Sequence, residues 1–488
     1  MFKIPKELFE RIGISADVDA PPLSRSRGYF SEALGRFLKL ASARVALGVI
    51  VAISLFSLLV PVLVRRSDAL MDPYYAKLPP RISVADHSRA VVRGGVSRYL
   101  GDVGFTRLLA IGIGSDISYS PIIGTGVYDG RGRTVRVDSY LEVGFVYKSV
   151  SAAEYEDILT WESMSGTRVL YPMVEDNGFN RDVSDANFWY KTDSDGYAVV
   201  MTEGDYRRAE ISESMHIEDN YMRDGEGEPI YALPVGGDGG YRVRVLYYNY
   251  YLYKNGMAPD YILGTDSQGY DLALRVAGGI RVSLLLAFSV SLINLVIGAL
   301  VGAVEGYYGG AVDLAIERVT DVLSGVPFIV VATLFQIYLS DSVGAIPSLL
   351  FAFVLTGWLG TANRVRGQFF RYKNSEYVLA AKTMGVSDRR IMWRHIFPNT
   401  LGTLITASAL IIPGVIFTES MLSFLGIVNL GAEGMTSLGA LLSDASGIWM
   451  NYPHLMIAPG VIISLLMISF NVIGNCLRDA FNPATKGG

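Results

Sequence analysis

The side chains that most often carry chemistry are few in this sequence and lie far apart. Four histidines (His87, His216, His395 and His454) have no metal-ligand spacing, which favours surface or membrane-interface positions for them. The run TDSDG at 192–196 resembles the start of a calcium loop but lacks the later ligands, so we interpret it as an acidic turn. No GxxxxGKS or GxxxxGKT phosphate loop is present, which argues against an ATP-driven motor within the chain.

Other polar residues lie inside or beside strongly apolar stretches. Glu419 and Asp444 could contact an amino group of a solute, although solvated loop acids are the simpler interpretation. Asn294 and Asn471 could form hydrogen bonds between helices, or could merely be tolerated there. No charged residue is expected to be buried within these apolar stretches, and ion-driven carriers usually need one. A metal centre, a disulfide framework and a catalytic set are therefore not indicated; Cys476 is the single cysteine.

The elements that must position these residues are mostly membrane helices. Half of the 488 residues are hydrophobic and the mean hydropathy is +0.32. Windows of about 20 apolar residues can cross a bilayer, and six are found, at 45–64, 281–303, 322–339, 346–363, 401–418 and 455–475. Only SDSVGAIPS (340–348) separates the third from the fourth, so these two could instead form one buried hairpin. The first window follows 44 residues and is expected to be a retained anchor rather than a cleaved signal peptide.

The charges near these windows predict an orientation. Residues 1–44 and 364–400 each carry eight basic residues, and six spans place both segments on one side, which the positive-inside rule identifies as the cytoplasm. We therefore expect a cytoplasmic tail (1–44), a first transmembrane helix (45–64), an extracytoplasmic domain (66–260) with a net charge of −9, and a five-helix core (264–482). Both termini would be cytoplasmic in a multi-pass protein of the cell membrane.

The extracytoplasmic domain is expected to be mostly β with some helix. PIYALPV (229–235) and YRVRVLYYNYYLY (241–253) flank a glycine-rich turn and predict a hairpin, and 132–148 and 196–206 add further strand-like runs. The tyrosine run at 247–253 favours a strand covered on both faces over an exposed aromatic patch. SAAEYEDILTWESM (151–164) predicts an amphipathic helix.

The segment EYVLAAKTMGVSDRRIMWRHIFPN (376–399) interrupts the apolar stretches with a predicted helix, turn and helix. Ser375 is placed to cap the first helix and Glu376 suits its first turn. Tyr377, Ala380, Ala381 and Met384 recur at helical spacing and predict one smooth face, and Gly385 predicts a left-handed end. Ser387 would start the second helix.

Two features of the apolar windows concern helix packing. Gly298 and Gly302 form a GxxxG motif that could permit close helix contact, or could simply be tolerated in a membrane helix. Pro413 could kink the fifth span, or it could be tolerated there without a kink.

Glu376, Ala380, Ala381, Gly385, Ile391 and Pro398 resemble, at these spacings, the EAA signature of binding-protein-dependent ABC importer permeases. The resemblance extends to 261–287, 305–327, 419–427, 439–449 and 478–483, and is nearest to the second permease subunit of dipeptide and oligopeptide importers, whose relatives also carry nickel. Tyr270 departs from it, because many relatives have arginine there, and so does the large extracytoplasmic domain.

The resemblance implies an α-helical polytopic membrane protein with six transmembrane helices of the type I ABC importer permease fold. It implies that loop 364–400 carries a coupling helix that docks onto an ATPase, through Glu376, Tyr377, Ala380, Ala381, Met384, Gly385, Ile391 and Pro398. The implied partners are a sister permease, two cytoplasmic ATP-binding-cassette ATPases that hold ATP and Mg²⁺, an extracytoplasmic solute-binding protein and membrane lipid, with no nucleic acid and no cofactor on this chain. The alternatives are a membrane-anchored receptor or enzyme acting through 66–260, and an ion-coupled secondary carrier.

Overall fold

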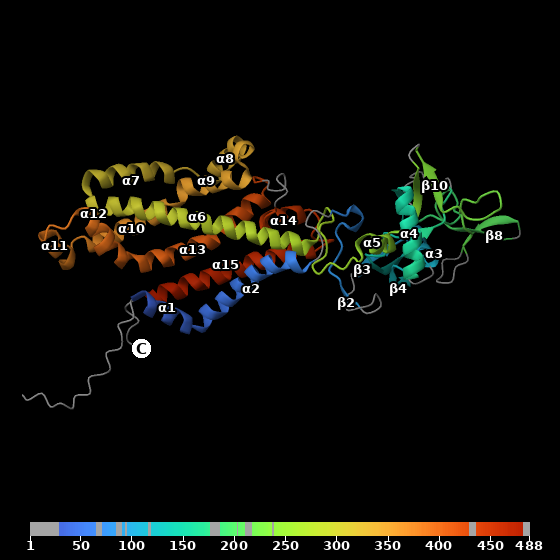
Figure 1. The fold of residues 1–488 in the computed structure, drawn as a ribbon, viewed down its shortest axis with the longest axis horizontal. Coiled ribbons are helices and arrows are strands. Elements are labelled where there is room, and N and C mark those ends of the chain that lie inside the picture. The colour runs from blue at the N-terminus through green and yellow to red at the C-terminus, as the bar shows by residue number, and fades with distance from the viewer. Residues whose placement is uncertain are drawn as a thin grey trace, which may run out of the picture.

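The computed structural model shows an elongated molecule with a helical bundle at one end and a mixed α and β domain at the other (Figure 1). The structure describes residues 29–64, 71–83, 90–92, 95–115, 119–175, 186–202, 204–209, 217–236, 239–428 and 436–481. His87, His216 and most of the tail predicted at 1–44 lie outside these ranges. We call the domain between the first two long helices the outer domain.

Long apolar helices make up the bundle. α1 (Tyr29–Lys39) and α2 (Ala41–Leu63) precede the outer domain, and α6 (Leu272–Tyr308), α13 (Phe397–Phe424) and α15 (His454–Phe481) follow it. In the described part of the chain, five helical segments are long and apolar enough to cross a membrane: 41–63, 272–308, 345–372, 388–424 and 454–481. α6, α13 and α15 extend beyond the predicted windows at both ends, and α2 begins earlier than its window.

The predicted third window corresponds to a bent pair of helices. α7 (Gly310–Ser324) ends inside the window and α8 (Phe328–Val343) begins after Pro327, with an angle of 76° between them. A helix starting at 322 was therefore wrong, because Pro327 disfavours helical geometry in the residue before it. Counted as one span, the pair would be the sixth.

The predicted fourth window is also built from two helices. α9 (Ala345–Gly357) is followed at once by α10 (Leu359–Tyr372). α8 and α9 pack side by side across Gly344, whose φ of +93° suits glycine. Gln336 Nε2 donates to the carbonyl of Ala345 over 2.9 Å, which ties the two helices together.

Small antiparallel sheets form the strand part of the outer domain. A four-stranded sheet has β11 (Gly240–Leu246) between β10 (Ala232–Val235) and β6 (Phe145–Val150), and β11 also pairs with β7 (Leu170–Tyr171). In a three-stranded sheet, β5 (Arg133–Asp138) lies between β3 (Gly95–Leu100) and β4 (Ile122–Tyr128). Two-stranded pairs are β1 (Ile82–Ser83) with β2 (Ala90–Val92), and β8 (Val199–Thr202) with β9 (Asp205–Arg208). The hairpin predicted around the glycine-rich turn is confirmed, with Val235 opposite Gly240.

Helices pack beside these sheets, so the outer domain is a mixture of α and β. They are α3 (Asp102–Gly114), α4 (Ala152–Ser165), α5 (Tyr247–Asn255) and a short 3-10 helix, η2 (Pro73–Tyr75). The predicted helix at 151–164 is confirmed as α4, whose first turn is capped by the Ser151 hydroxyl.

The strand predicted for the tyrosine run is wrong, because β11 ends at Leu246 and α5 begins at Tyr247. Helical spacing brings Tyr247 and Tyr251 onto one buried face against Tyr75, with ring centroids 4.9 and 5.4 Å away. The Tyr247 hydroxyl also donates to the buried carboxylate of Asp72.

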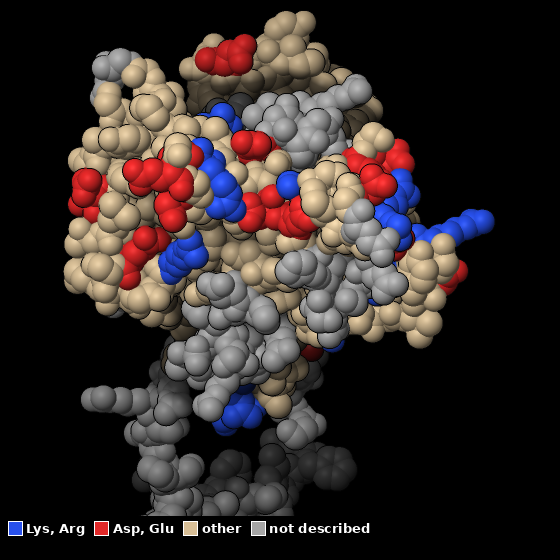
Figure 2. All heavy atoms as spheres, turned by 90° about the vertical axis from the view of Figure 1, so that its right-hand side faces the viewer, with Lys and Arg blue, Asp and Glu red and all other residues tan. Residues whose placement is uncertain are grey.

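The exposed end of the outer domain carries acidic and basic side chains interspersed with uncharged ones (Figure 2). The TDSDG turn belongs to this domain. Asp193 accepts hydrogen bonds from the amides of Asp195 and Tyr197, and Arg208 forms ion pairs with Asp193 and Asp195 over 2.6 Å each. The carboxylates of this turn therefore have cationic partners from β9.

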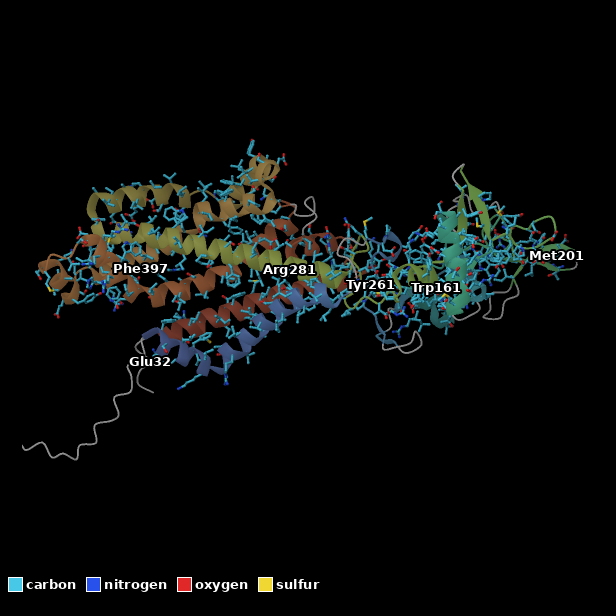
Figure 3. All side chains as sticks on the ribbon, viewed as in Figure 1. Glu32, Trp161, Met201, Tyr261, Arg281 and Phe397 are labelled. Carbon is cyan, nitrogen blue, oxygen red and sulfur yellow. The ribbon has the colours of Figure 1, made fainter. Side chains whose placement is uncertain are left out.

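The two segments that connect the outer domain to the bundle are paired with each other. Residues 72–81 and 261–271 exchange hydrogen bonds: the Lys77 amide donates to the Asp266 carbonyl over 2.9 Å, and the Arg81 amide donates to the Tyr261 carbonyl over 2.9 Å. The Thr265 hydroxyl accepts from the Leu78 amide over 2.8 Å. We call this paired connection the stem; Tyr261 marks it in Figure 3.

Candidate functional site

Residues 376–397 form two short helices at the end of the bundle opposite the outer domain (Figure 1). α11 (Glu376–Thr383) is followed by Gly385, whose φ of +77° is the left-handed conformation predicted for it. α12 (Asp388–Arg390) then continues through a π-helical segment, η4 (Ile391–Ile396), into α13. The Ser375 side chain does not cap α11 as predicted; its hydroxyl donates to the Tyr372 carbonyl instead.

The single smooth face predicted for α11 is divided between interior and surface. Ala381 is only 2% exposed and packs with Val378 and Ile391 in a core that includes α6. Tyr377, Leu379 and Met384 are 41, 47 and 77% exposed, and Ala380 is exposed beside them. Ala381 and Ile391 therefore hold the segment onto the bundle, whereas Tyr377, Ala380 and Met384 are accessible to another molecule.

The remaining predicted residues of the segment are exposed. Glu376 lies in the first turn of α11, and Pro398 is in the first turn of α13, where its missing N–H costs nothing. Phe397, labelled in Figure 3, precedes it at this end of the bundle. The structure thus brings the eight predicted residues into one segment, with six at its surface and two beneath it.

The last turn of α6 fastens this segment to the bundle. The Tyr307 hydroxyl donates to Asp388 Oδ1 over 2.5 Å, and the ammonium of Lys382 lies 5.1 Å from the centroid of the Tyr307 ring. Lys373 Nζ donates to the Gly306 carbonyl over 3.1 Å, at the helix end that favours a cation. Contacts from α10, α11 and α12 therefore converge on one turn of α6.

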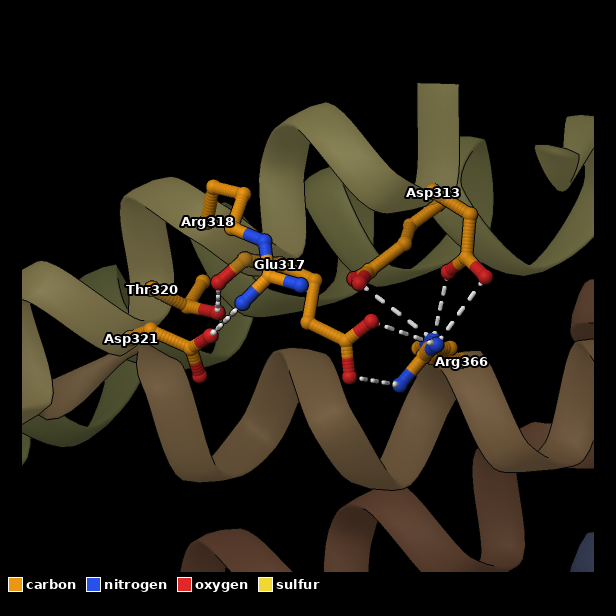
Figure 4. A network of polar contacts seen from close by, with 7 residues as sticks. Asp313, Glu317, Arg318, Thr320, Asp321 and Arg366 are labelled. Atoms are coloured by element: carbon orange, nitrogen blue, oxygen red, sulfur yellow. Dashed lines mark hydrogen bonds and ion pairs between the residues drawn. The ribbon is translucent and has the colours of Figure 1, made fainter. Parts of the chain in front are cut away.

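A cluster of charged residues lies beside that turn and was not found from the sequence. Arg366 on α10 makes a bidentate pair with Asp313 at 2.6 and 2.9 Å, and its guanidinium is also within 3.4 Å of carboxylate oxygens of Glu317 and Glu305 (Figure 4). Glu305 is 1% exposed. The planar guanidinium suits a bidentate site, so a single side chain joins α6, α7 and α10. The i, i+4 spacing of Asp313 and Glu317 was the available sequence signal.

Gly298 and Gly302 lie where α6 and α10 approach each other closely. A Cβ atom on Gly298 would be 2.6 Å from Thr361 Cβ, and one on Gly302 would be 2.9 Å from Val365 Cβ. Gly306 continues the stripe, with a Cβ 2.7 Å from Phe369 Cβ. The four-residue spacing therefore extends one step beyond the GxxxG motif. At these three positions α6 contributes no side chain to its contact with α10.

Glu419 is buried, and its interpretation as a solvated loop acid was wrong. It lies on α13, 1% exposed, and accepts hydrogen bonds of 3.0 Å from the hydroxyls of Ser283 and Ser423. Ser437, which caps α14 (Leu438–Ala445), also bonds to it. The prediction failed because α13 continues beyond the apolar window that ended at 418.

The other predicted polar residues have separate surroundings. Asn294 is buried and its Nδ2 donates to the Phe353 carbonyl of α9 over 3.4 Å, so it does join two helices. Asn471 is exposed on α15, and Asp444 is exposed on α14. Pro413 is buried inside a continuous α13. His395 lies in η4 and His454 begins α15, and no cluster of potential metal ligands occurs among the described residues.

Residues 294–487 match the protein family described as "Binding-protein-dependent transport system inner membrane component". The dipeptide transport system permease protein DppC of Lactococcus lactis subsp. cremoris is 36% identical over 236 residues, 48% of this chain and 67% of the relative. DppC of Bacillus subtilis is 39% identical over 230 residues, 46% of this chain and 70% of the relative. The oligopeptide permease OppC of Haemophilus influenzae is 42% identical over 227 residues, 46% and 71% of the two chains.

A solved chain of the inward-facing methionine ABC transporter MetNI shares 16% sequence identity and a TM-score of 0.36, over 42% of this chain and 94% of that one. This likeness is too weak to support a conclusion. The family match covers the C-terminal part of α6 from residue 294, together with α13, α15 and the helices between them, and it does not include the outer domain.

Proposed function

Because this chain belongs to the family of binding-protein-dependent transport system inner membrane components, we propose that it is the transmembrane permease subunit of an ATP-driven importer whose cargo is a peptide. The peptide assignment is supported by relatives named as dipeptide and oligopeptide permeases at 36 to 42% identity. The chain does not carry out chemistry on its cargo; it provides part of the path.

The exposed part of segment 376–384 is the observation that carries the proposal. Tyr377, Leu379 and Met384 are exposed apolar residues on and directly after a short helix outside the membrane-spanning part of the bundle. Exposed apolar patches rimmed by polar residues mark protein interaction sites. We propose that a cytoplasmic ATPase subunit docks here, with ATP and Mg²⁺ held by two such subunits, and that Glu376 and Gly385 set the position of the helix.

The geometry supports a mechanical role for the segment. Val378, Ala381 and Ile391 pack against α6, and the Tyr307 hydroxyl of α6 donates to Asp388 of the segment. Lys373, just before the segment, donates to the Gly306 carbonyl of α6. A displacement of α11 by an ATPase would therefore move the last turn of α6, and through Arg366 it would move α7 and α10 as one unit. Alternation of these helices against those of a sister permease would open and close a path for the peptide.

The orientation follows from this proposal. The ATPase side is the cytoplasm, so the proposed termini are cytoplasmic and the outer domain is extracytoplasmic. The bent pair α7 and α8 is the proposed sixth span. We further propose that the outer domain is a docking platform for the solute-binding protein, because the stem holds it at the mouth of the bundle.

The test is peptide uptake into proteoliposomes that contain the complete transporter. Met384→Asp should lower the uptake per ATP hydrolysed, because it places a charge in the docking surface. Met450→Asp is the matched control, since Met450 is 80% exposed at the other end of the bundle, against 77% for Met384. Gly385→Pro should also uncouple transport, because proline cannot adopt a φ of +77°. Peptide uptake that needs no ATP, or a purified complex without an ATPase, would refute the proposal.

The platform proposal has its own test. Removing residues 82–257 while keeping the stem should weaken capture of the binding protein and leave the ATPase attached. Unchanged capture and uptake would show that the outer domain has another role.

A further inference from the structure

An apolar cleft of about 640 Å³ lies beneath the stem, between the first and last long helices of the bundle. α2 contributes Ala52, Ile53 and Phe56 to it, and α15 contributes Ile457, Ala458, Val461 and Ile462. Pro80 and Leu263 of the stem also line it. Among the lining residues that the structure describes, His454, next to the stem, is the one ionisable side chain.

The cleft is continuous with the surface that the bundle presents to lipid. Val51 and Leu55 on α2 are 47 and 48% exposed, and Ile457 and Val461 on α15 are 60 and 50% exposed. Both helices are long and apolar enough to span a membrane. A hydrocarbon chain from the bilayer can therefore reach the cleft sideways without crossing a polar barrier.

The end of the cleft at the stem carries a cation in an unusual backbone conformation. Lys77 has a φ of +62°, and it is the only non-glycine residue with positive φ in the described part of the chain. Its amide donates to the Asp266 carbonyl, which is part of the stem pairing. Strained residues of this kind persist where the surroundings hold them, often at ligand sites.

The Lys77 ammonium lies beside Tyr452, and the two residues that follow Tyr452 line the cleft. Its Nζ is 5.8 Å from the centroid of the Tyr452 ring, and Tyr452 precedes the lining residues Pro453 and His454. Trp449, 46% exposed, lies on the same connection between α14 and α15. Tyrosine, tryptophan and lysine together are typical of the level of lipid headgroups. No carboxylate forms an ion pair with this ammonium among the residues that the structure describes.

We propose that the cleft is a binding site for one phospholipid of the surrounding bilayer. Its acyl chain lies between α2 and α15, and its phosphate meets the Lys77 ammonium beside Tyr452. Apolar lining with a single cation at the headgroup end matches the division of a phospholipid into hydrocarbon and anion. The bound lipid joins α2 to α15 below the stem.

Native mass spectrometry of the purified chain in mild detergent tests this proposal by counting retained phospholipid. The wild-type chain should retain one phospholipid molecule. Ala458→Trp should abolish retention because the indole fills the cleft. Ile468→Trp is the matched control, because Ile468 is 61% exposed on α15 and does not line the cleft.

Lys77→Gly distinguishes the effect of the cation on lipid binding from any effect on folding. Glycine adopts positive φ without strain, so this variant should unfold thermally at the same temperature as the wild type or higher in lipid-free detergent. Its retention of phospholipid should nevertheless fall by about fivefold, the effect of about one lysine's attraction to an anionic lipid surface. Lys77→Arg keeps the charge and should retain the lipid.

Three results would overturn the proposal. The first is equal retention by wild type and Ala458→Trp. The second is a wild-type cleft that holds only exchangeable detergent, with no retained phospholipid. The third is Ala458→Trp abolishing assembly with the sister permease, with lipid retention unchanged, which would identify the cleft as a protein interface. None of these measurements depends on what the chain transports.

Discussion

The hydroxyl of Tyr307 and the carboxylate of Asp388 are joined by a hydrogen bond of 2.5 Å, between the last turn of α6 and the first turn of α12. The two residues are far apart in sequence, and the bond crosses from a membrane-spanning helix to the segment proposed to receive the ATPase. Hydrogen bonds to charged groups contribute about 1.5–3 kcal/mol. A bond of that strength can transmit a displacement between the two elements.

Tyr307→Phe should therefore weaken coupling. We expect ATP hydrolysis by the complete transporter to persist while peptide uptake per ATP falls, because α6 no longer follows α12. Tyr308→Phe is the control, since the Tyr308 side chain is 54% exposed and forms no hydrogen bond among the described residues. In a double-mutant cycle, Asp388→Asn should add little to Tyr307→Phe. Additive losses would contradict a direct link.

Arg366→Lys should destabilise the bundle although it keeps the charge. A lysine cannot reproduce the bidentate pair with Asp313 and also reach Glu317 and the buried Glu305. Arg318→Lys serves for comparison, because Arg318 is 73% exposed and forms a single-contact ion pair with the exposed Asp321. In detergent, the thermal unfolding temperature should fall for Arg366→Lys and not for Arg318→Lys. Equal unfolding temperatures would show that the cluster does not stabilise the bundle.

Gly302→Ala should cost about 1–3 kcal/mol by overpacking the contact between α6 and α10. Its Cβ would meet the backbone and Val365 of α10, neither of which can move aside easily. Gly367→Ala, on the exposed side of α10 with open space around it, should instead be stabilising by about 0.5–1 kcal/mol. The unfolding free energies of both variants, measured in the same detergent, should be lower than wild type for Gly302→Ala and higher for Gly367→Ala.

Glu419→Leu should destabilise the region where α6, α13 and α14 meet. The hydroxyls of Ser283 and Ser423 would lose their acceptor, and each unpartnered buried polar group costs about 1–3 kcal/mol. Glu419→Gln keeps an acceptor oxygen and should be milder. Asp444→Leu, an exposed acid on α14, provides the comparison. If Asp444→Leu lowers the thermal unfolding temperature as much as Glu419→Leu does, the buried hydrogen bonds of Glu419 are not the cause.

Arg244→Met should loosen the outer domain and leave the bundle intact. Arg244 is 0% exposed on β11 and donates to the carbonyls of Ala186 and Pro172, and burial lowers the pKa of its guanidinium to about 10. The variant leaves both carbonyls without these donors, at a cost of about 1–3 kcal/mol each. Arg242→Met, a partly exposed neighbour on the same strand, is the control. Hydrogen exchange should rise around β6 and β11 only in the first variant.

The sequence predicted well where one local rule decides the outcome. Gly385 ends α11 in the left-handed conformation because glycine there has no steric cost, and the glycine turn of the β10 and β11 hairpin follows the same logic. The apolar windows located the long helices because hydrocarbon thickness sets their length.

Long-range packing could not be predicted in the same way. Whether Ala381 faces the interior depends on its packing against α6. The burial of Glu419 depends on Ser283 and Ser437, which come from other segments. The tyrosine run forms a helix because two stem residues stabilise it: Tyr75 packs against the Tyr247 ring and Asp72 accepts a hydrogen bond from the Tyr247 hydroxyl. In each case a tertiary contact decided the outcome, and the local pattern did not contain it.

The pairing of residues 72–81 with 261–271 has a mechanical consequence. A domain attached through a single segment can rotate, because rotation about one chain meets little resistance. Two segments joined by several hydrogen bonds resist twisting. Asp271, at the end of the stem, caps α6. Torque applied to the outer domain is therefore delivered to α6, the same helix whose other end holds Asp388.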